Sequence, residues 1–216
     1  MRLLAAVLGA VAAVALGGCA IEGTPTWPGA RLASTLLTSA DFPPGVQFDR
    51  ILEQPGQPDG ATDAPAMLSQ PEGCANALTR VIAGSAERGP GSAAKYSVAY
   101  DGVRTVMTVL IGPLDLDQLE ATASRCEVFL TFFDPMSEPI PVTTTKLPSP
   151  RPDMLVYQQT IQLGGDESSV YFAFENVAES GMFGMAFPTE DPAISVKGTL
   201  PQTFLDIMDK QADRLE

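Results

Sequence analysis

The sequence contains no histidine. This absence excludes Ser-His-Asp and Cys-His catalysis, histidine-ligated zinc or haem, and the two-histidine iron site, because each needs an imidazole. It also removes the side chain that ordinarily changes charge near neutral pH. Acidic pairs such as Asp115 and Asp117 lack the glycine and terminal glutamate of an EF-hand loop. We therefore expect no catalytic residue, no metal and no cofactor.

Basic residues are scarce as well. The chain has 13 Lys and Arg against 26 Asp and Glu, a formal net charge of −13. An acidic surface of this kind repels nucleic acid and anionic lipid headgroups. We expect no nucleic-acid partner, and any hold on a membrane must come from attached lipid.

The apolar run at the N-terminus is too short to span a membrane. Leu3 to Leu16 is 14 residues, against the roughly 20 that a spanning helix needs. It follows Arg2 and leads into Leu16-Gly17-Gly18-Cys19, the order of a bacterial lipoprotein signal with its lipobox. An ordinary cleaved signal that happens to contain a cysteine is the alternative. We predict a signal peptide over 1–18, a lipidated and palmitoylated Cys19 with a tether over 19–31, and one extracytoplasmic envelope domain over 32–216.

Two cysteines remain once Cys19 carries lipid. Cys74 and Cys126 are an even pair in an oxidising compartment, and each lies on an apolar stripe at helical spacing. The stripes predict helices over about 72–83 and 115–133, so we expect one interhelix disulfide. A redox-active pair is the alternative, but the spacing is not C-x-x-C.

The remaining pattern predicts an α+β domain. Asp101-Gly102 between two alternating apolar runs indicates a hairpin with a type I′ turn. A long surface loop is expected over 53–73. The expected strands lie near 96–100, 103–111, 142–147, 154–163, 169–176 and 182–187, and further helices lie near 32–37 and after Pro201. We therefore expect a largely antiparallel sheet of about six strands with helices packed on it.

Two segments carry a resemblance. The segment from Leu36 to Gly45 resembles the opening of a family of uncharacterised mycobacterial and actinobacterial lipoproteins. Gln70-Pro71-Glu72-Gly73-Cys74 is similar to the extracellular sensor domain of mycobacterial receptor serine/threonine kinases. Those sensor domains typically have two disulfides, whereas this chain can form one. The resemblance implies an envelope sensor or ligand-binding module and no chemistry.

Three segments resemble active-site or pocket motifs. Gly164-Gly165-Asp166-Glu167 is similar to the diguanylate cyclase signature, but an acidic Gly-Gly turn also joins two strands. Ser92 and Lys95 match the S-x-x-K of penicillin-binding proteins, yet they lead into a strand rather than a helix. The Met- and Phe-rich run over 182–187 fits either an adaptable pocket or, more simply, core.

Two functions fit these features. The first is a non-catalytic, lipid-anchored module that binds a small ligand or a lipid as sensor or carrier. The second is a protein-interaction or assembly factor at the outer face of the cytoplasmic membrane. An enclosed apolar cavity between sheet and helices would favour the first. A solid core with an exposed apolar patch would favour the second. The sequence names no ligand-binding residue.

Overall fold

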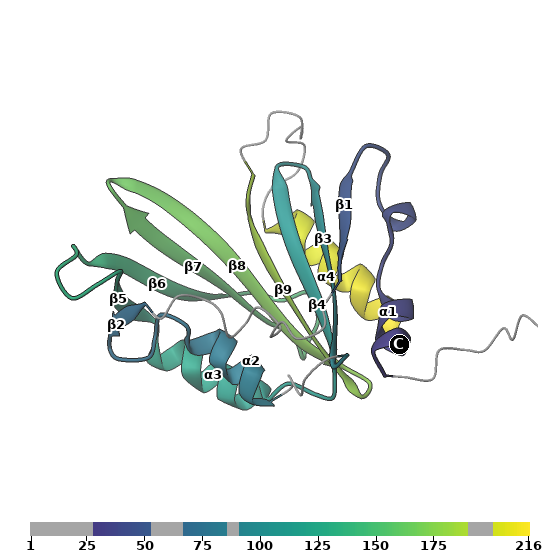
Figure 1. Cartoon of the computed structure of the whole chain (residues 1–216), viewed down its shortest axis with the longest axis horizontal. Coiled ribbons are helices and arrows are strands. Elements are labelled where there is room, and N and C mark those ends of the chain that lie inside the picture. The colour runs from purple at the N-terminus through teal and green to yellow at the C-terminus, as the bar shows by residue number, and fades with distance from the viewer. Residues whose placement is uncertain (1–27, 53–66, 86–90, 190–200) are drawn as a thin grey trace, which may run out of the picture.

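The computed structural model describes residues 28–52, 67–85, 91–189 and 201–216. Within these ranges four α-helices and nine strands follow one another (Figure 1). The helices are α1 (Pro28–Thr35), α2 (Ala77–Ser85), α3 (Leu116–Arg125) and α4 (Gln202–Leu215), with a short 3-10 turn at Ser39–Asp41. The strands are β1 (Gln47–Ile51), β2 (Leu68–Gln70), β3 (Ala93–Tyr100), β4 (Val103–Ile111), β5 (Val128–Phe132), β6 (Ile140–Leu147), β7 (Leu155–Leu163), β8 (Asp166–Val177) and β9 (Ser180–Pro188). No helix in the described ranges is both long and apolar enough to cross a membrane.

All nine strands form one antiparallel sheet. Its order is β1-β3-β4-β9-β8-β7-β6-β5-β2, so β1 and β2 follow each other in the chain but lie at opposite edges. The chain is therefore α+β with a large antiparallel sheet, as predicted.

The predicted strand number of about six is wrong, because β1, β2 and β5 were not foreseen. Four of the five residues of β1 are exposed, so this edge strand lacks an apolar alternation. The three residues of β2 lie inside the segment that was expected to be a loop. The helix predicted to Phe133 ends at Arg125, and the Val-Phe-Leu-Thr-Phe of β5 follows. That run of β-branched and aromatic residues favours a strand, although its apolar spacing also fits a helix.

The turns of the two long hairpins follow the sequence. Asp101 and Gly102 both have positive φ (52° and 75°), as a type I′ turn requires, and Tyr100 pairs with Val103 across them. Gly164 and Gly165 likewise have φ of 62° and 95° between β7 and β8. These two turns set the register of four central strands.

Helices cover the two faces of the sheet at different ends. α1 and α4 pack against β3, β4, β8 and β9. α2 and α3 pack on the opposite face, where their apolar residues meet those of β5 to β9 (Figure 1). We call the face under α1 and α4 the first face and the face under α2 and α3 the second face.

Helix α4 lies very close to the sheet. A Cβ placed on Gly184 of β9 would come within 2.7 Å of Met208 Sδ and of Phe204 Cε2 on α4. Both α4 side chains are fully buried, as are Met107 and Met182 around them. Glycine at position 184 therefore lets the helix fill the space above the sheet.

A buried glutamine joins the first helix to the last. Gln211 of α4 is fully buried; its Nε2 donates to Thr35 O (3.0 Å), and its Oε1 accepts from the Leu37 N–H (3.1 Å). These bonds occupy a carbonyl and an N–H at the C-terminal end of α1 that burial would otherwise leave unpaired.

Replacing Gly184 tests the closeness of α4 to the sheet. We expect Gly184→Ala to lower the free energy of unfolding by about 1–3 kcal/mol, because the new methyl overpacks the contact with Phe204 and Met208. Gly84→Ala in α2 is the matched control, since nothing lies within 4 Å of its Cβ position. Chemical denaturation of both variants measures the difference; equal stability of the two would contradict this packing.

Candidate functional site

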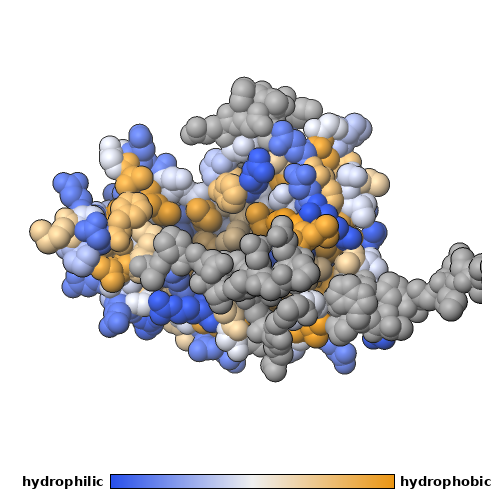
Figure 2. Space-filling model, in the orientation of Figure 1, coloured by the Kyte–Doolittle hydropathy of each residue, from blue (hydrophilic) through white to orange (hydrophobic). Residues whose placement is uncertain are grey.

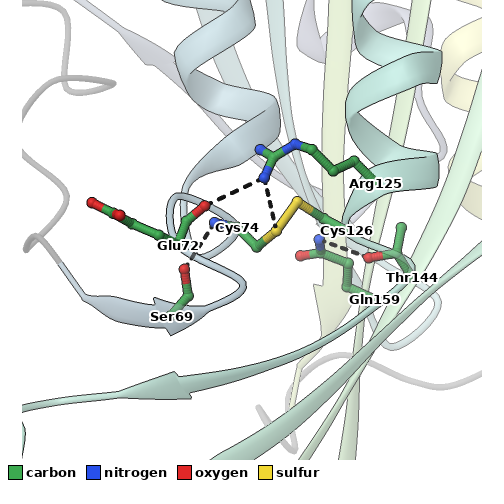
Figure 3. Close-up of a disulfide and its surroundings, with 7 residues drawn as sticks. All are labelled: Ser69, Glu72, Cys74, Arg125, Cys126, Thr144 and Gln159. Carbon is green, nitrogen blue, oxygen red and sulfur yellow. Dashed lines mark hydrogen bonds between the residues drawn. A yellow bond between two sulfur atoms is a disulfide. The ribbon is translucent and has the colours of Figure 1, made fainter.

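The structure brings Cys74 and Cys126 together in a disulfide, with their Cα atoms 5.5 Å apart (Figure 3). The prediction of this bond is confirmed, but it is not strictly interhelical. Cys74 lies in the turn before α2, and Cys126 is the residue that caps the end of α3. The Cys74 N–H donates to Ser69 Oγ (2.8 Å), and Arg125 Nη1 donates to Glu72 O (3.3 Å). The disulfide thus joins the start of α2 to the end of α3.

This disulfide is part of the core. Cys74 and Cys126 are 1% and 3% exposed, and they pack with Phe129 and Val142 of the sheet. A thiol that takes part in redox exchange needs access for a partner thiol. The environment therefore fits a structural role. Cys19, the predicted lipid attachment, lies outside the described residues.

The segments that resemble active sites do not form one. Gly164 and Gly165 form the exposed turn between β7 and β8, and Asp166 and Glu167 are the first residues of β8. Lys95 lies in β3 and Ser92 just before it, so no helical turn brings their side chains together. In the 182–187 run, Met182, Phe183, Gly184 and Ala186 are buried, and the α4 side chains occupy the space above Gly184. That run is core, which confirms the simpler interpretation.

A shallow depression lies between α2 and α3. Its lining is Arg80, Val81, Gly84, Asp115 and Gln118, around a volume of about 290 Å³. Asp115 is already used as the N-cap of α3, where its Oδ1 accepts from the Gln118 N–H at 2.9 Å. One of the two charged groups in this depression therefore serves as a helix cap.

The strongest electrostatic cluster centres on Arg151, in the connection between β6 and β7. Its Nε donates to Oε1 of the buried Glu175 on β8 at 2.7 Å. Its other nitrogens meet Asp209 and Asp213 of α4 at 3.3 and 3.4 Å and Glu216, the residue after α4, at 2.6 Å. Arg151 thereby fastens α4 to the sheet. Within the described ranges no three His, Cys, Asp or Glu side chains are arranged to hold a metal ion.

Burial raises the pKa of the Glu175 carboxyl, while the hydrogen bond and charge of Arg151 lower it. Glu175 Oε2 is buried without a hydrogen-bond partner. The ionised carboxylate therefore depends on Arg151 alone for compensation.

The first face of β5, β6, β7 and β2 has a different character, and we call it the open face. The register places on it the residues that alternate with the second-face core residues Phe129, Val142 and Ile161. They include Leu68, Gln70, Val128, Leu130, Phe132, Pro141, Thr143, Thr145, Gln158, Thr160 and Gln162, and none of these is charged. Thr143, Thr145 and Val128 are exposed, so this part of the sheet is accessible.

Exposed apolar side chains gather next to the open face. Of the eight large hydrophobic residues that are exposed in the described ranges, five lie on β2, on β5, in the turn that follows β5, or at the end of β7. They are Leu68 (46% exposed), Val128 (67%), Phe133 (68%), Met136 (93%) and Leu163 (57%). We call these five residues the distal surface. At the corresponding left end of Figure 2, hydrophobic residues lie among hydrophilic ones.

The pairing of the strands explains why four of these residues lie at one end of the sheet, while Val128 lies at the other end of β5. Leu68 pairs with Phe132, next to Phe133. Ile140 pairs with Thr131, and Val142 pairs with Ile161, so the turns after β5 and β7 lie at the same end of the sheet. Both turns are at the left end of Figure 1, away from α1 and α4.

Sequence reasoning missed the distal surface. It placed Phe133 on the buried stripe of a helix, whereas Phe133 is exposed in the turn after β5. Asp134-Pro135 was the available signal, because proline cannot continue a helix and disfavours helical geometry in the residue before it. Arg151 and Glu175 were missed as well, since they lie 24 residues apart and only the fold joins them.

Comparisons with known proteins bear on the fold alone. No protein-family model matches the sequence, and a comparison with curated proteins finds no match. Among solved structures, the chain is similar to an uncharacterised protein from Mycobacterium smegmatis. The TM-score is 0.51 at 13% sequence identity, over 85% of this chain and 96% of that one. The likeness shows a shared fold with a mycobacterial protein.

Breaking the disulfide should lower stability. We expect Cys74→Ser to reduce the free energy of unfolding by about 4 kcal/mol, since the bond closes a loop across a sequence separation of 52. Thermal unfolding with and without reductant measures this effect; the variant should melt earlier and respond no further to reductant. Unchanged melting would show that the disulfide does not stabilise the fold.

Removing Arg151 should have an effect that depends on pH. Burial favours the protonated form of Glu175 and so raises the pKa of its carboxyl group. Above that pKa the buried carboxylate is charged and lowers the free energy of unfolding when Arg151 is absent. As the pH decreases, the carboxylate becomes protonated and this destabilisation disappears. We expect Arg151→Met to cost about 3 kcal/mol at neutral pH and less near pH 4. Lys146→Met is the control, because the Lys146–Glu120 pair is about half exposed on both sides and should contribute less than about 1 kcal/mol. Denaturation at both pH values measures the two losses; a pH-independent loss for Arg151→Met would contradict the role of Glu175.

Proposed function

We propose that this protein is a non-catalytic, lipid-anchored interaction module of the cell envelope, which binds a protein partner through the distal surface. The observation that carries the proposal is the distribution of apolar side chains. The space between α4 and the sheet is filled at Gly184, whereas large apolar residues are exposed at the opposite end. Exposed apolar residues that gather at one end of a molecule among polar neighbours are typical of protein-binding surfaces.

The sensor or carrier alternative needs an internal site. The Met- and Phe-rich run at 182–187 was the candidate lining for one, and its first-face residues are packed under Phe204 and Met208. A surface partner therefore fits the geometry better than an enclosed ligand does.

The lipid anchor complements this role. A bacterial lipoprotein carries at least two acyl chains, enough for stable anchoring. The acidic chain itself is repelled by anionic headgroups, so the tether rather than the body would hold it at the membrane. Such a module remains free to turn its distal surface toward a neighbouring protein.

Replacing the lipidated residue tests the anchor. We expect Cys19→Ala to move the protein from the membrane pellet to the soluble fraction, because no other attachment is proposed. Fractionation at low and high salt measures this, with the unaltered chain as the control. Retention of Cys19→Ala in the pellet at both salt concentrations would contradict lipid anchoring.

Site-specific photo-crosslinking tests the docking surface. We expect a benzophenone amino acid at position 133 or 136 of the full-length chain to give one discrete protein adduct in native membranes. The same probe at Asp117, which is exposed on α3, should give none. An excess of the purified chain without residues 1–19 should compete the adduct away. An absence of adducts, or equal adducts from all three positions, would contradict docking at the distal surface.

A further inference from the structure

The acidic residues around the distal surface have no basic partners among the residues that the structure describes. The chain has no Lys or Arg between Arg125 and Lys146, and none between Arg151 and Lys197. The connection after β5 and the start of β8 nevertheless carry four exposed acids: Asp134, Glu138, Asp166 and Glu167. None of the four forms an ion pair within the described part of the chain. Their charges are therefore available to an incoming partner.

The turn that carries Met136 is held in place by hydrogen bonds. The Met136 N–H donates to Asp134 Oδ1 (2.8 Å), and the Ser137 N–H and Oγ both donate to Asp134 O (3.1 and 2.8 Å). The Asp134 N–H in turn donates to Ser137 Oγ (3.1 Å). A turn organised in this way presents Met136 with little further loss of conformational entropy on binding.

We propose that the partner presents a basic and apolar surface, in which apolar side chains contact Phe133 and Met136 while Lys or Arg side chains meet the four acids. This inference rests on the proposed function and specifies the partner of the same surface. Charge complementarity selects that partner: unpaired carboxylates around an apolar patch attract cations and repel acidic proteins. They also oppose insertion of the turn into an anionic lipid surface, so a protein fits better than a membrane.

Reversing the charge of the acids around the distal surface tests the inference. We call Asp134, Glu138, Asp166 and Glu167 the acidic rim. The variant is Glu138→Lys with Asp166→Lys and Glu167→Lys; Asp134 is left unchanged because it holds the turn. The matched control reverses three exposed acids away from the distal surface: Asp49 on β1, Asp117 on α3 and Glu179 between β8 and β9. Both variants change the net charge of the chain equally, and thermal unfolding checks that both are folded.

The readout is the protein adduct formed from the benzophenone probe at position 133 in native membranes. We expect the rim variant to reduce the adduct about tenfold and the matched control to leave it unchanged. The adduct of the otherwise unaltered chain should decrease as NaCl rises from about 50 to about 500 mM, since salt screens exposed charges.

Each other outcome overturns a distinct claim. A protein adduct that persists after charge reversal of the rim and at high salt would contradict the proposal that the partner is basic. It would not contradict docking at the distal surface. An equal loss of adduct in both variants would show that binding depends on the net charge of the chain and not on the acids of the rim. That result also overturns the inference. A lipid adduct, or no adduct, would overturn the proposed function itself.

Discussion

The contact between α4 and Gly184 is the constraint on which the rest of the structure depends. With no side chain at position 184, Phe204 and Met208 rest directly on the sheet, and α4 completes the core of the first face. Gln211 then attaches α1 to α4, and Arg151 fastens the outer side of α4 to Glu175. The space that a larger separation would leave for a ligand is occupied by side chains. Binding by this protein is therefore expected on its surface.

The two helix pairs lie on opposite faces and toward opposite ends of one long sheet. The disulfide between Cys74 and Cys126 holds α2 and α3 against the second face, beneath β5 and β6. The first face of the same strands carries only uncharged residues, in a chain with a net charge of −13. Four exposed acids lie instead at the end of these strands, in the connection after β5 and at the start of β8. This separation of a neutral face from an acidic rim is the basis of the proposed docking mode.

Local signals in the sequence predict the parts of the fold that depend on neighbouring residues. Asp101-Gly102 predicts its turn because only a few residues adopt positive φ readily, and Asp115 predicts the start of α3 because its side chain caps the helix. The even number of cysteines that remain after Cys19, together with the oxidising compartment, predicts the disulfide. Local pattern fails at β5, where apolar spacing fits helix and strand equally. Local sequence patterns cannot predict the Arg151 cluster or the distal surface, because both arise from contacts between residues that are far apart in the chain.

The central claim is that a partner covers the distal surface in the native envelope. The most direct measurement is the rate of maleimide labelling of a cysteine at position 136, in native membranes and in the purified chain. A cysteine at position 117 on α3 is the reference, since Asp117 and Met136 are both exposed. If a partner covers the distal surface, labelling at position 136 should be about tenfold slower in membranes than in the purified chain, relative to position 117, because binding excludes the reagent. Equal relative rates in the two preparations would contradict the central claim.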